Sequence, residues 1–184
     1  MKDREIEVKV ELTPEEFQNF AGENAGVFAL ERTYGYFKDD FSNITEGIFP
    51  RIKYIEGEKR EIILTVKRKK KDNAQFFERE EVEVKVCEEE NGDTPRELMK
   101  ALGFSKEIIF EKRRKNVFKD DMVISFDELP VGFFAEFEGD PEKIEQYLGE
   151  YTLSQRPRIT KAYLGVWEDY KKTHGITEEH CVFK

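Results

Sequence analysis

The stretch Glu5-Ile6-Glu7-Val8-Lys9-Val10-Glu11-Leu12 decides the fold, because charged and apolar side chains alternate at every position along it. A period of two places the apolar side chains on one face of a β-strand and the charged ones on the other. The same alternation returns in Glu81-Val82-Glu83-Val84-Lys85 and in later segments. The sequence therefore predicts a series of strands that each have one apolar and one charged face.

The predicted elements are mostly consecutive strands. Eight strands are expected, over residues 4–12, 28–37, 48–55, 60–67, 76–86, 108–118, 122–128 and 133–138. Helices are expected to begin at Thr13-Pro14-Glu15-Glu16, Thr94-Pro95-Arg96-Glu97, Asp140-Pro141 and Ala162, the first two with the same hydroxyl, proline and glutamate start signal. This order favours an α+β fold, mainly antiparallel β, with an eight-stranded closed β-barrel (a tunnel) and a few flanking helices. Residues 1–184 are predicted to form a single domain.

The composition limits the class of protein. The chain of 184 residues has a net charge of −9, but 13% of its residues are aromatic, which is too much core material for a disordered acidic chain. The negative charge argues against general nucleic-acid binding, whose affinity comes mostly from cations on phosphates. The charged residues 1–5 and the lack of a long apolar stretch argue against a signal peptide and a membrane helix. Cys87 and Cys181 are far apart and fit no disulfide scaffold or zinc site, so the expected location is the cytoplasm.

The charged faces of the strands can point either into a shared lumen or out to water. An ordinary antiparallel sheet, polar toward solvent, produces the same alternation. Two patterns favour the lumen, because acids repeat two positions apart on separate strands and bases do the same. The acidic pairs are Glu5/Glu7, Glu81/Glu83 and Glu136/Glu138, and the basic pairs are Arg51/Lys53 and Lys112/Arg114. Acids suit hard divalent cations and bases suit phosphate oxygens, so together they indicate a site for a metal-bound polyphosphate.

The order of these motifs resembles that of the CYTH superfamily, the triphosphate tunnel metalloenzymes that include class IV adenylyl cyclases and thiamine or inorganic triphosphatases. Glu5-Ile6-Glu7-Val8-Lys9 resembles its N-terminal ExExK signature. The later RxR, TxK, RxExE, KxR, single Asp and ExE motifs are similar to Arg51-Ile52-Lys53, Thr65-Val66-Lys67, Arg79-Glu80-Glu81-Val82-Glu83, Lys112-Arg113-Arg114, Asp127 and Glu136-Phe137-Glu138. Lys161 and Tyr163 are similar to the Lys-Tyr element that closes the tunnel. Lys53 departs from the pattern, since lysine keeps the charge but lacks the planar fork of arginine.

The resemblance implies a closed tunnel that binds a triphosphate lengthwise, with one or two Mg²⁺ or Mn²⁺ ions as cofactor. The residues that would hold the phosphates at the catalytic centre are Lys9, Arg51, Lys53, Lys67, Arg79, Lys112, Arg114 and Lys161. The metal ligands would come from Glu5, Glu7, Glu81, Glu83, Asp127, Glu136 and Glu138. A structural ion pair is the alternative for any single carboxylate, and Lys85 is expected to be a pairing or rim charge.

Three functions follow as hypotheses. The first is metal-dependent hydrolysis of a small-molecule triphosphate, such as inorganic triphosphate, thiamine triphosphate or ATP. The second is adenylyl cyclase activity, in which the ribose 3′-hydroxyl of ATP attacks the α-phosphorus and pyrophosphate leaves. The third is a non-catalytic module that binds polyphosphate or an RNA 5′-triphosphate end. No membrane partner is expected, and family members often form homodimers.

Two further features are interpreted as surface features. Residues 67–71 contain a run of basic side chains that is expected to be a solvated hairpin end, where it attracts anions toward the tunnel mouth. His174, His180 and Cys181 lie close to the C-terminus and are interpreted as surface residues.

Overall fold

The structure is a computed structural model that describes residues 3–69, 77–86 and 93–184, and their side chains over residues 6–68, 79–86 and 93–184. In chain order the elements are β1 (Asp3–Leu12), α1 (Pro14–Glu23), β2 (Ala29–Phe37), α2 (Ser42–Thr45), β3 (Ile48–Glu56), β4 (Arg60–Lys69), β5 (Phe77–Val86), α3 (Thr94–Ala101), β6 (Lys106–Lys119), β7 (Met122–Leu129), β8 (Gly132–Glu138), α4 (Pro141–Glu150), β9 (Arg158–Ile159) and α5 (Tyr163–His174). The eight predicted strands are therefore present in the predicted order, and β9 is an additional two-residue strand.

The strands form one antiparallel sheet. Their order is β5-β4-β3-β2-β6-β7-β8-β1-β9, so most neighbours in space are also neighbours in sequence. The long strand β6 joins the two halves, because its first residues pair with β2 and its last residues pair with β7. Short connections at Gly57 and at Gly132 allow consecutive strands to turn back on each other, and Gly132 does so with a φ of 146°.

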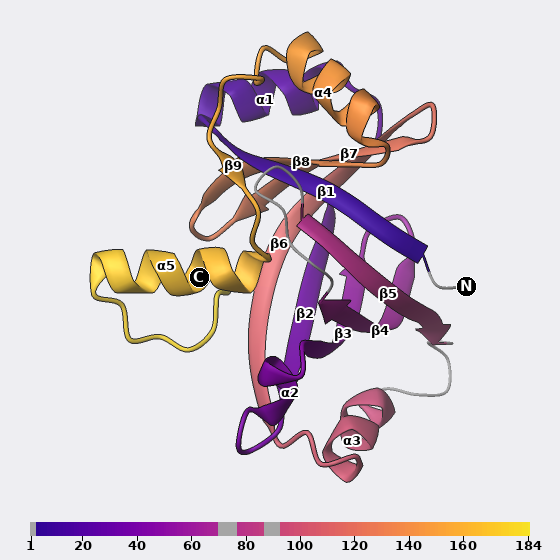
Figure 1. The fold of residues 1–184 in the computed structure, drawn as a ribbon, viewed down its shortest axis with the longest axis vertical. Coiled ribbons are helices and arrows are strands. Elements are labelled where there is room, and N and C mark those ends of the chain that lie inside the picture. Colours follow the sequence, from indigo (N-terminus) through magenta and orange to yellow (C-terminus); the bar gives the residue numbers. More distant parts are fainter. Residues whose placement is uncertain (1–2, 70–76, 87–92) are drawn as a thin grey trace.

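β1 pairs along both of its edges. Residues Glu7–Leu12 pair with β8, and residues Asp3–Glu7 pair with β5, which is at the other end of the strand order. The curved sheet therefore brings β5, the first strand of the order, beside β1, the last long strand (Figure 1). The α+β class with mainly antiparallel β is confirmed, whereas complete closure into an eight-stranded barrel is not confirmed and stays a prediction.

Helices cover the apolar faces of most strands from outside, whereas Val82 and Val84 of β5 are exposed. α1 and α4 pack over β1, β7 and β8, where Val8, Val10, Ile124, Phe126 and Phe137 are fully buried (Figure 1). Burial of each such side chain stabilises the fold by ~1.5–3 kcal/mol. A second apolar cluster lies under α3, on the outer face of β2, β3 and β4. Since the apolar faces pack outward, the charged faces of the same strands must point inward.

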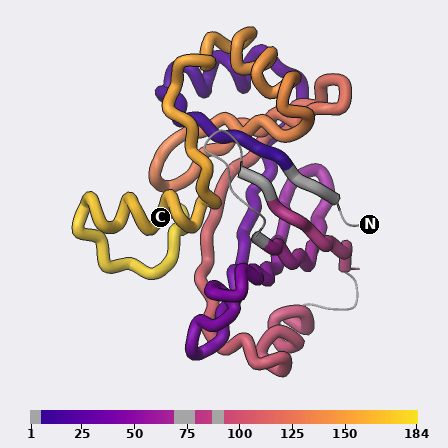
Figure 2. Tube along the Cα trace, viewed as in Figure 1, coloured from indigo at the N-terminus to yellow at the C-terminus, as the bar shows by residue number. Residues whose placement is uncertain are grey.

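The C-terminal segment is part of the sheet wall. The chain after α5 returns to the first half of β6, where Glu111 N donates to Cys181 O at 2.8 Å and Cys181 N donates to Ile109 O at 2.9 Å. Figure 2 shows this yellow segment beside β6. Cys181 is only 1% exposed, so the interpretation of this residue as a surface residue is wrong. The cause is long-range pairing with β6, which local sequence does not reveal.

Two local predictions also need correction. The residue that caps α3 is Asp93, not Thr94, and within the described chain no side chain closes the capping hydrogen bond of this helix. The segment 39–47, which lies between the strands expected over 28–37 and 48–55 and in which no helix was expected, contains the short helix α2. Cys87 and the last two residues of the basic run, Lys70 and Lys71, lie outside the described residues. None of the helices in the described part of the chain is both long and apolar enough to cross a membrane.

Candidate active site

The inner faces of the strands enclose a cavity of about 650 Å³. Residues from α2 and from the start of α5 complete its lining. The predicted site residues that line the cavity are Glu7, Lys9, Arg51, Lys53, Lys67, Arg79, Glu81, Glu83, Lys112, Arg114, Glu136, Glu138 and Lys161. The structure thus brings together side chains from six long strands and the residues before α5.

The charged rows point into this cavity and not over the outside of the sheet. Lys9 is 2% exposed and Glu136 is 5% exposed, although both carry charge. Charged groups of a solvated sheet face would remain accessible, and their burial is tolerated only when each is paired or hydrogen-bonded. The lumen interpretation of the alternation is therefore the one that matches the structure.

One group of ion pairs lies where β1, β6 and β8 meet. Lys9 Nζ pairs with Glu7 and lies 3.2 Å from Glu136 Oε2, and Arg114 Nη2 lies 2.9 Å from Glu136 Oε1. Burial alone would raise the pKa of Glu136, but the charges of Arg114 and Lys9 outweigh it and hold that pKa well below its usual value. Glu136 is therefore an anion that two cations hold in place.

Asp127 lies behind this group, fully buried. Its carboxylate accepts bonds of 2.6 Å from Nε and Nη2 of Arg114 and a bond of 2.6 Å from the Tyr163 hydroxyl. It is outside the set of residues that line the cavity. Its predicted role as a metal ligand remains untested, and the contacts describe a residue that orients Arg114 and anchors the first turn of α5.

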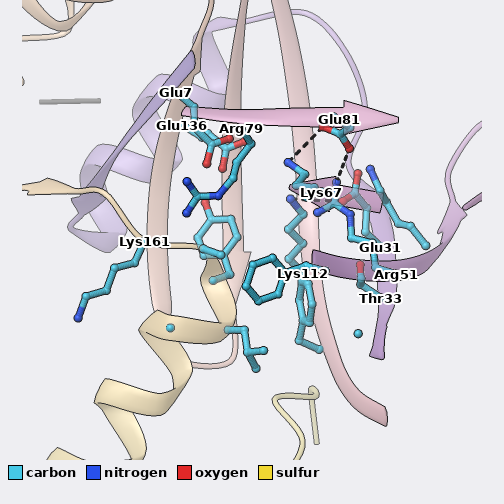
Figure 3. Close-up of a pocket in the computed structure, with 18 of the residues that line it drawn as sticks. Glu7, Glu31, Thr33, Arg51, Lys67, Arg79, Glu81, Lys112, Glu136 and Lys161 are labelled. Atoms are coloured by element: carbon cyan, nitrogen blue, oxygen red, sulfur yellow. Dashed lines mark hydrogen bonds and ion pairs between the residues drawn. The ribbon is translucent and has the colours of Figure 1, made fainter. Parts of the chain in front are cut away.

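A second group of ion pairs surrounds Glu81 on β5. Its Oε1 lies 2.9 Å from Nη2 of Arg51, and its Oε2 lies 3.2 Å from Nζ of Lys67. Figure 3 shows these two contacts as dashed lines, with Glu7, Glu136 and Arg79 gathered on the other side of the cavity. Burial opposes ionisation of Glu81, but Lys67 and Arg51 lower its pKa overall. The RxExE carboxylate thus serves as an internal partner for two cations.

Glu31 on β2 is a site residue that the sequence reasoning missed. Its Oε2 lies 3.3 Å from Nζ of Lys112, and the charges of Lys112 and Arg114 overcome its burial and lower its pKa to about 2. Lys53 is partly buried, and desolvation lowers its pKa to about 8, with Glu31 opposing the shift and Arg51 adding to it. A signal for Glu31 was present, because Glu31, Thr33 and Gly35 alternate along β2 with Tyr34 and Tyr36.

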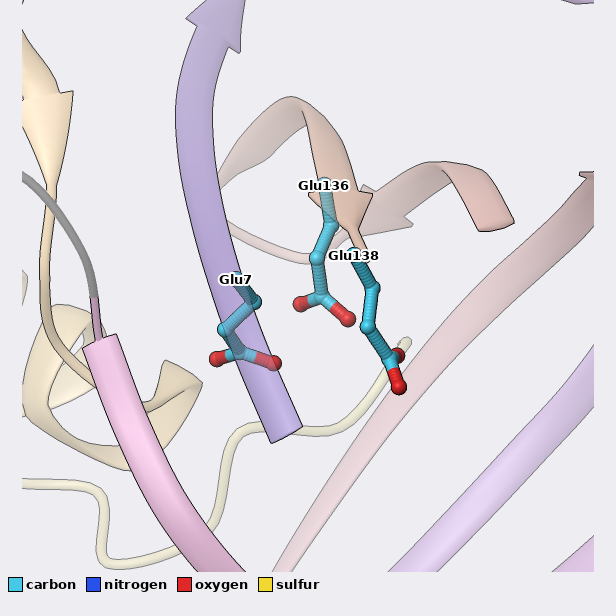
Figure 4. A group of neighbouring side chains, drawn as sticks. All are labelled: Glu7, Glu136 and Glu138. Atoms are coloured by element: carbon cyan, nitrogen blue, oxygen red, sulfur yellow. The ribbon is translucent and has the colours of Figure 1, made fainter. Parts of the chain in front are cut away.

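Three carboxylates form a cluster with the donor set of a divalent metal site. Glu7 on β1 and Glu136 and Glu138 on β8 each offer one oxygen, and these oxygens lie within 4.8 Å of one another. Figure 4 shows the three side chains extending into the same space between β1 and β8. Carboxylate oxygens are the ligands that Mg²⁺ and Mn²⁺ prefer, so the residues present fit such an ion.

Lys161 and Glu5 differ from the other predicted site residues in where the structure places them. Lys161 lines the rim of the cavity, but its Nζ bonds Asp169 of α5 at 2.6 Å, and in Figure 3 its side chain points away from the labelled cavity residues. The backbone of Glu5 lies in β1 and pairs with Arg79, while its side chain is outside the described part of the chain. Lys85 forms an ion pair with Glu61 at 2.9 Å outside the cavity lining, as expected for a pairing charge.

No protein-family model matches this chain, and no curated protein matches it. Solved structures do match over almost the whole chain. A protein from Pyrococcus horikoshii is 20% identical with a TM-score of 0.72, covering 90% of this chain and 99% of its own. A candidate adenylate cyclase from Vibrio parahaemolyticus is 16% identical with a TM-score of 0.72, covering 91% and 99%. A candidate adenylyl cyclase from Hippeastrum, described as having a dominant triphosphatase activity, is 13% identical with a TM-score of 0.63, covering 92% and 96%.

At these identities the likeness concerns the fold. The matches extend over nearly the whole length of each solved structure, so the curved sheet and its flanking helices correspond as a unit. The chain shares the fold of these adenylate cyclase candidates, which agrees with the fold that the sequence resemblance to the CYTH superfamily implies.

Proposed function

We propose that this protein is a metal-dependent phosphoryl-transfer enzyme that binds a triphosphate in its central cavity and hydrolyses it. The observation that carries the proposal is the convergence of cations from β1, β3, β4, β5 and β6 on one cavity, beside a cluster of three carboxylates. Phosphoryl transfer requires mainly positioning and charge stabilisation from a protein, and this arrangement supplies both.

We infer that the eight long strands close around the cavity as a tunnel. The pairing of β1 with β5 on one edge and with β8 on the other supports this closure. So does the burial of inward charges on both halves of the sheet, for example Lys9 and Lys112. A tunnel would allow an extended polyphosphate to contact cations from all sides along its length.

The phosphate oxygens would be held by the inward cations Lys9, Arg51, Lys53, Lys67, Arg79, Lys112 and Arg114. Arg114 is fixed by Asp127 before any ligand arrives, so its orientation costs little on binding. A divalent ion would be held by Glu7, Glu136 and Glu138, and when bound it would supply charge at the phosphate oxygens and acidify a water. Glu5, Glu81 and Glu83 remain proposed further ligands from the family pattern.

Adenylyl cyclase activity is the second candidate function. The fold likeness includes both candidate adenylate cyclases and a protein described as having a dominant triphosphatase activity. Both reactions need the same cations and the same metal ligands, and they differ in the nucleophile. A non-catalytic module for polyphosphate or an RNA 5′-triphosphate end would use the cations without turnover.

The test is an incubation of the purified protein with inorganic triphosphate, thiamine triphosphate or ATP, each with Mg²⁺ or Mn²⁺. Release of phosphate is the expected result. Cyclic AMP together with pyrophosphate would select the cyclase instead. Tight binding of all three compounds without any product would show that the protein is a binding module.

A single substitution tests the carboxylate cluster. Glu136→Gln keeps the size of the side chain but removes the charge that faces Lys9 and Arg114, so metal-dependent turnover should fall by about 100-fold or more. The matched control is Glu145→Gln, because Glu145 pairs with Arg158 outside the cavity lining. Equal turnover of both variants, with both folded by circular dichroism, would contradict the assignment of Glu136.

A further inference from the structure

Glu111 is a buried charged residue that does not line the catalytic cavity. It lies on β6 between Phe110 and Lys112, whose side chains line the cavity, so its own side chain points to the opposite face of the strand. Only 4% of Glu111 is exposed, and a carboxylate in such a place is costly unless cations or hydrogen-bond donors surround it. The groups that contact Glu111 therefore indicate its role.

Glu111 connects strand β2 to the end of the chain. Its Oε1 accepts a bond of 2.6 Å from Nε of Arg32 on β2, and its Oε2 accepts a bond of 3.0 Å from the backbone N–H of Phe183. The guanidinium carbon of Arg113 lies 4.3 Å from the centre of the Phe183 ring. Glu111 and Arg113 thus hold residues 179–183, the C-terminal segment, against the outer face of β6.

The C-terminal segment lies along an edge of β6, before the pairing with β7 begins. On one edge β6 pairs with β2 from residue 106 onward, whereas on the other edge the pairing with β7 begins at residue 113. The parallel bridge between Cys181 and Phe110 lies on this second edge, because β2 already occupies the first. The bridge fixes the backbone of β6 directly before Lys112, so the segment forms part of the wall that carries this cation.

The same segment holds α5 through Trp167, the single tryptophan of the chain. Trp167 is 6% exposed, and its Nε1 donates to the backbone O of Glu179 at 3.1 Å. One turn earlier on α5, the Tyr163 hydroxyl bonds to Asp127 at 2.6 Å, and the centre of the Tyr163 ring lies 5.2 Å from Nζ of Lys112. The place of Tyr163 in the site therefore depends on the bond that holds the next turn of α5.

We propose that Glu111 is a positioning residue for the triphosphate site, because it holds the C-terminal segment that in turn fixes Lys112 of β6 and Tyr163 of α5. This inference rests on the proposed function, in which Lys112 holds phosphate oxygens. Without the Glu111 contacts every cation remains present, but Lys112 and Tyr163 lose their fixed geometry. Binding of the phosphate chain then weakens, while the carboxylate cluster on β1 and β8 stays in place.

The first test is Glu111→Gln in the full chain, with inorganic triphosphate and Mg²⁺ as the probe. The KM should rise about fivefold or more while kcat changes less than about twofold, because the variant loosens a cation that holds the substrate and leaves the metal ligands alone. Trp167→Phe keeps an aromatic ring but lacks the indole N–H, so it should also raise KM. The matched control is Glu107→Gln, because Glu107 lies on the same face of β6 and pairs with Arg96 at 2.6 Å instead. Its KM should be that of the wild type.

Fluorescence of Trp167 provides a readout that does not depend on activity. In Glu111→Gln the emission should shift to longer wavelength, because release of the segment exposes the indole, whereas Glu107→Gln should leave it unchanged. Phe183→Pro removes the N–H that bonds to Glu111 and leaves the carboxylate itself in place, so it decides the question should Glu111→Gln fail to fold. It should raise KM more than its control Phe183→Ala, which removes the ring but keeps the N–H.

The proposal is wrong if Glu111→Gln or Phe183→Pro, folded by circular dichroism, keeps the KM of the wild type, or lowers kcat as strongly as it raises KM. Those results would leave triphosphate hydrolysis intact. Absence of binding and of turnover of inorganic triphosphate, thiamine triphosphate and ATP by the wild type would overturn the proposed function instead. The emission of Trp167 in Glu111→Gln would still show whether Glu111 holds the C-terminal segment.

Discussion

Lys53 is a cavity-lining lysine whose pKa lies below its usual value. Burial lowers its pKa to about 8, so the side chain is charged below that pH and neutral above it. A triphosphate binds the charged form better, so its affinity should weaken as the pH rises through the pKa. Lys53→Arg keeps the charge and should preserve the affinity to a pH at least about one unit higher.

Titration calorimetry with inorganic triphosphate over a range from about pH 7 to about pH 10 would measure this shift. The matched control is Lys85→Arg, because Lys85 pairs with Glu61 outside the cavity lining. If the wild type and Lys53→Arg lose affinity over the same pH range, Lys53 does not contribute its charge to phosphate binding.

At the scale of single residues, the sequence predicted which side chains point into the cavity better than it predicted which residues they contact. Lys9 and Glu136 were predictable because strict alternation places both on the polar face of their strands. Glu31 was missed because the aromatic residues that follow it in β2 obscure the alternation of polar and apolar positions. The bonds from Arg114 and Tyr163 to Asp127 join residues that are far apart in the sequence, and no local pattern encodes such contacts.

Helices α1 and α3 offer a comparison at the scale of elements, since both begin with Thr-Pro and a glutamate two residues later. In α1, Glu16 N donates to the Thr13 hydroxyl and Thr13 N donates to the Glu16 carboxylate, which is a complete capping box. In α3 the capping position is Asp93, so Thr94 lies within the first turn. Thr13→Ala should therefore cost ~1 kcal/mol of unfolding free energy, and Thr94→Ala only a few tenths, about 0.3 kcal/mol.

Urea denaturation of the two variants beside the wild type would measure both values. An equal loss for the two threonines would mean that the different caps have no energetic effect. The long alternating strands were predicted closely because each carries several repeats of the period. The capping residue of α3 and the two-residue β9 were not, because caps and short strands depend on one or two tertiary contacts.

At the scale of the whole molecule, closure of the sheet depends on how β5 pairs along its two edges. Residues 79–81 of β5 pair with β4 on one side and with β1 on the other, whereas residues 82–86 have β4 as their described partner. If the strands close, every amide over 79–81 should be protected from hydrogen exchange. Over 82–86, alternate amides should exchange quickly, as they do along an edge strand.

Amide-resolved hydrogen exchange by NMR would measure this difference, with residues 82–86 as the internal control in the same strand. Fast exchange of alternate amides over 79–81 would show that β5 remains an edge. Closure could be expected from sequence only through the family resemblance, because alternation fixes which face of a strand is charged but not whether the two ends of a sheet meet.

The cations in the cavity already have carboxylate partners, such as Glu81 for Arg51 and Lys67 and Glu136 for Lys9. An incoming anion must exchange with these internal counter-ions, and each exchange costs the pair that it replaces. A chain of several phosphates engages many cations at once, whereas a lone phosphate engages few. On the proposed function, the cavity would thus favour a chain of phosphates over a single phosphate, and renewed pairing of the cations with their carboxylates would help to release a short product after each cycle.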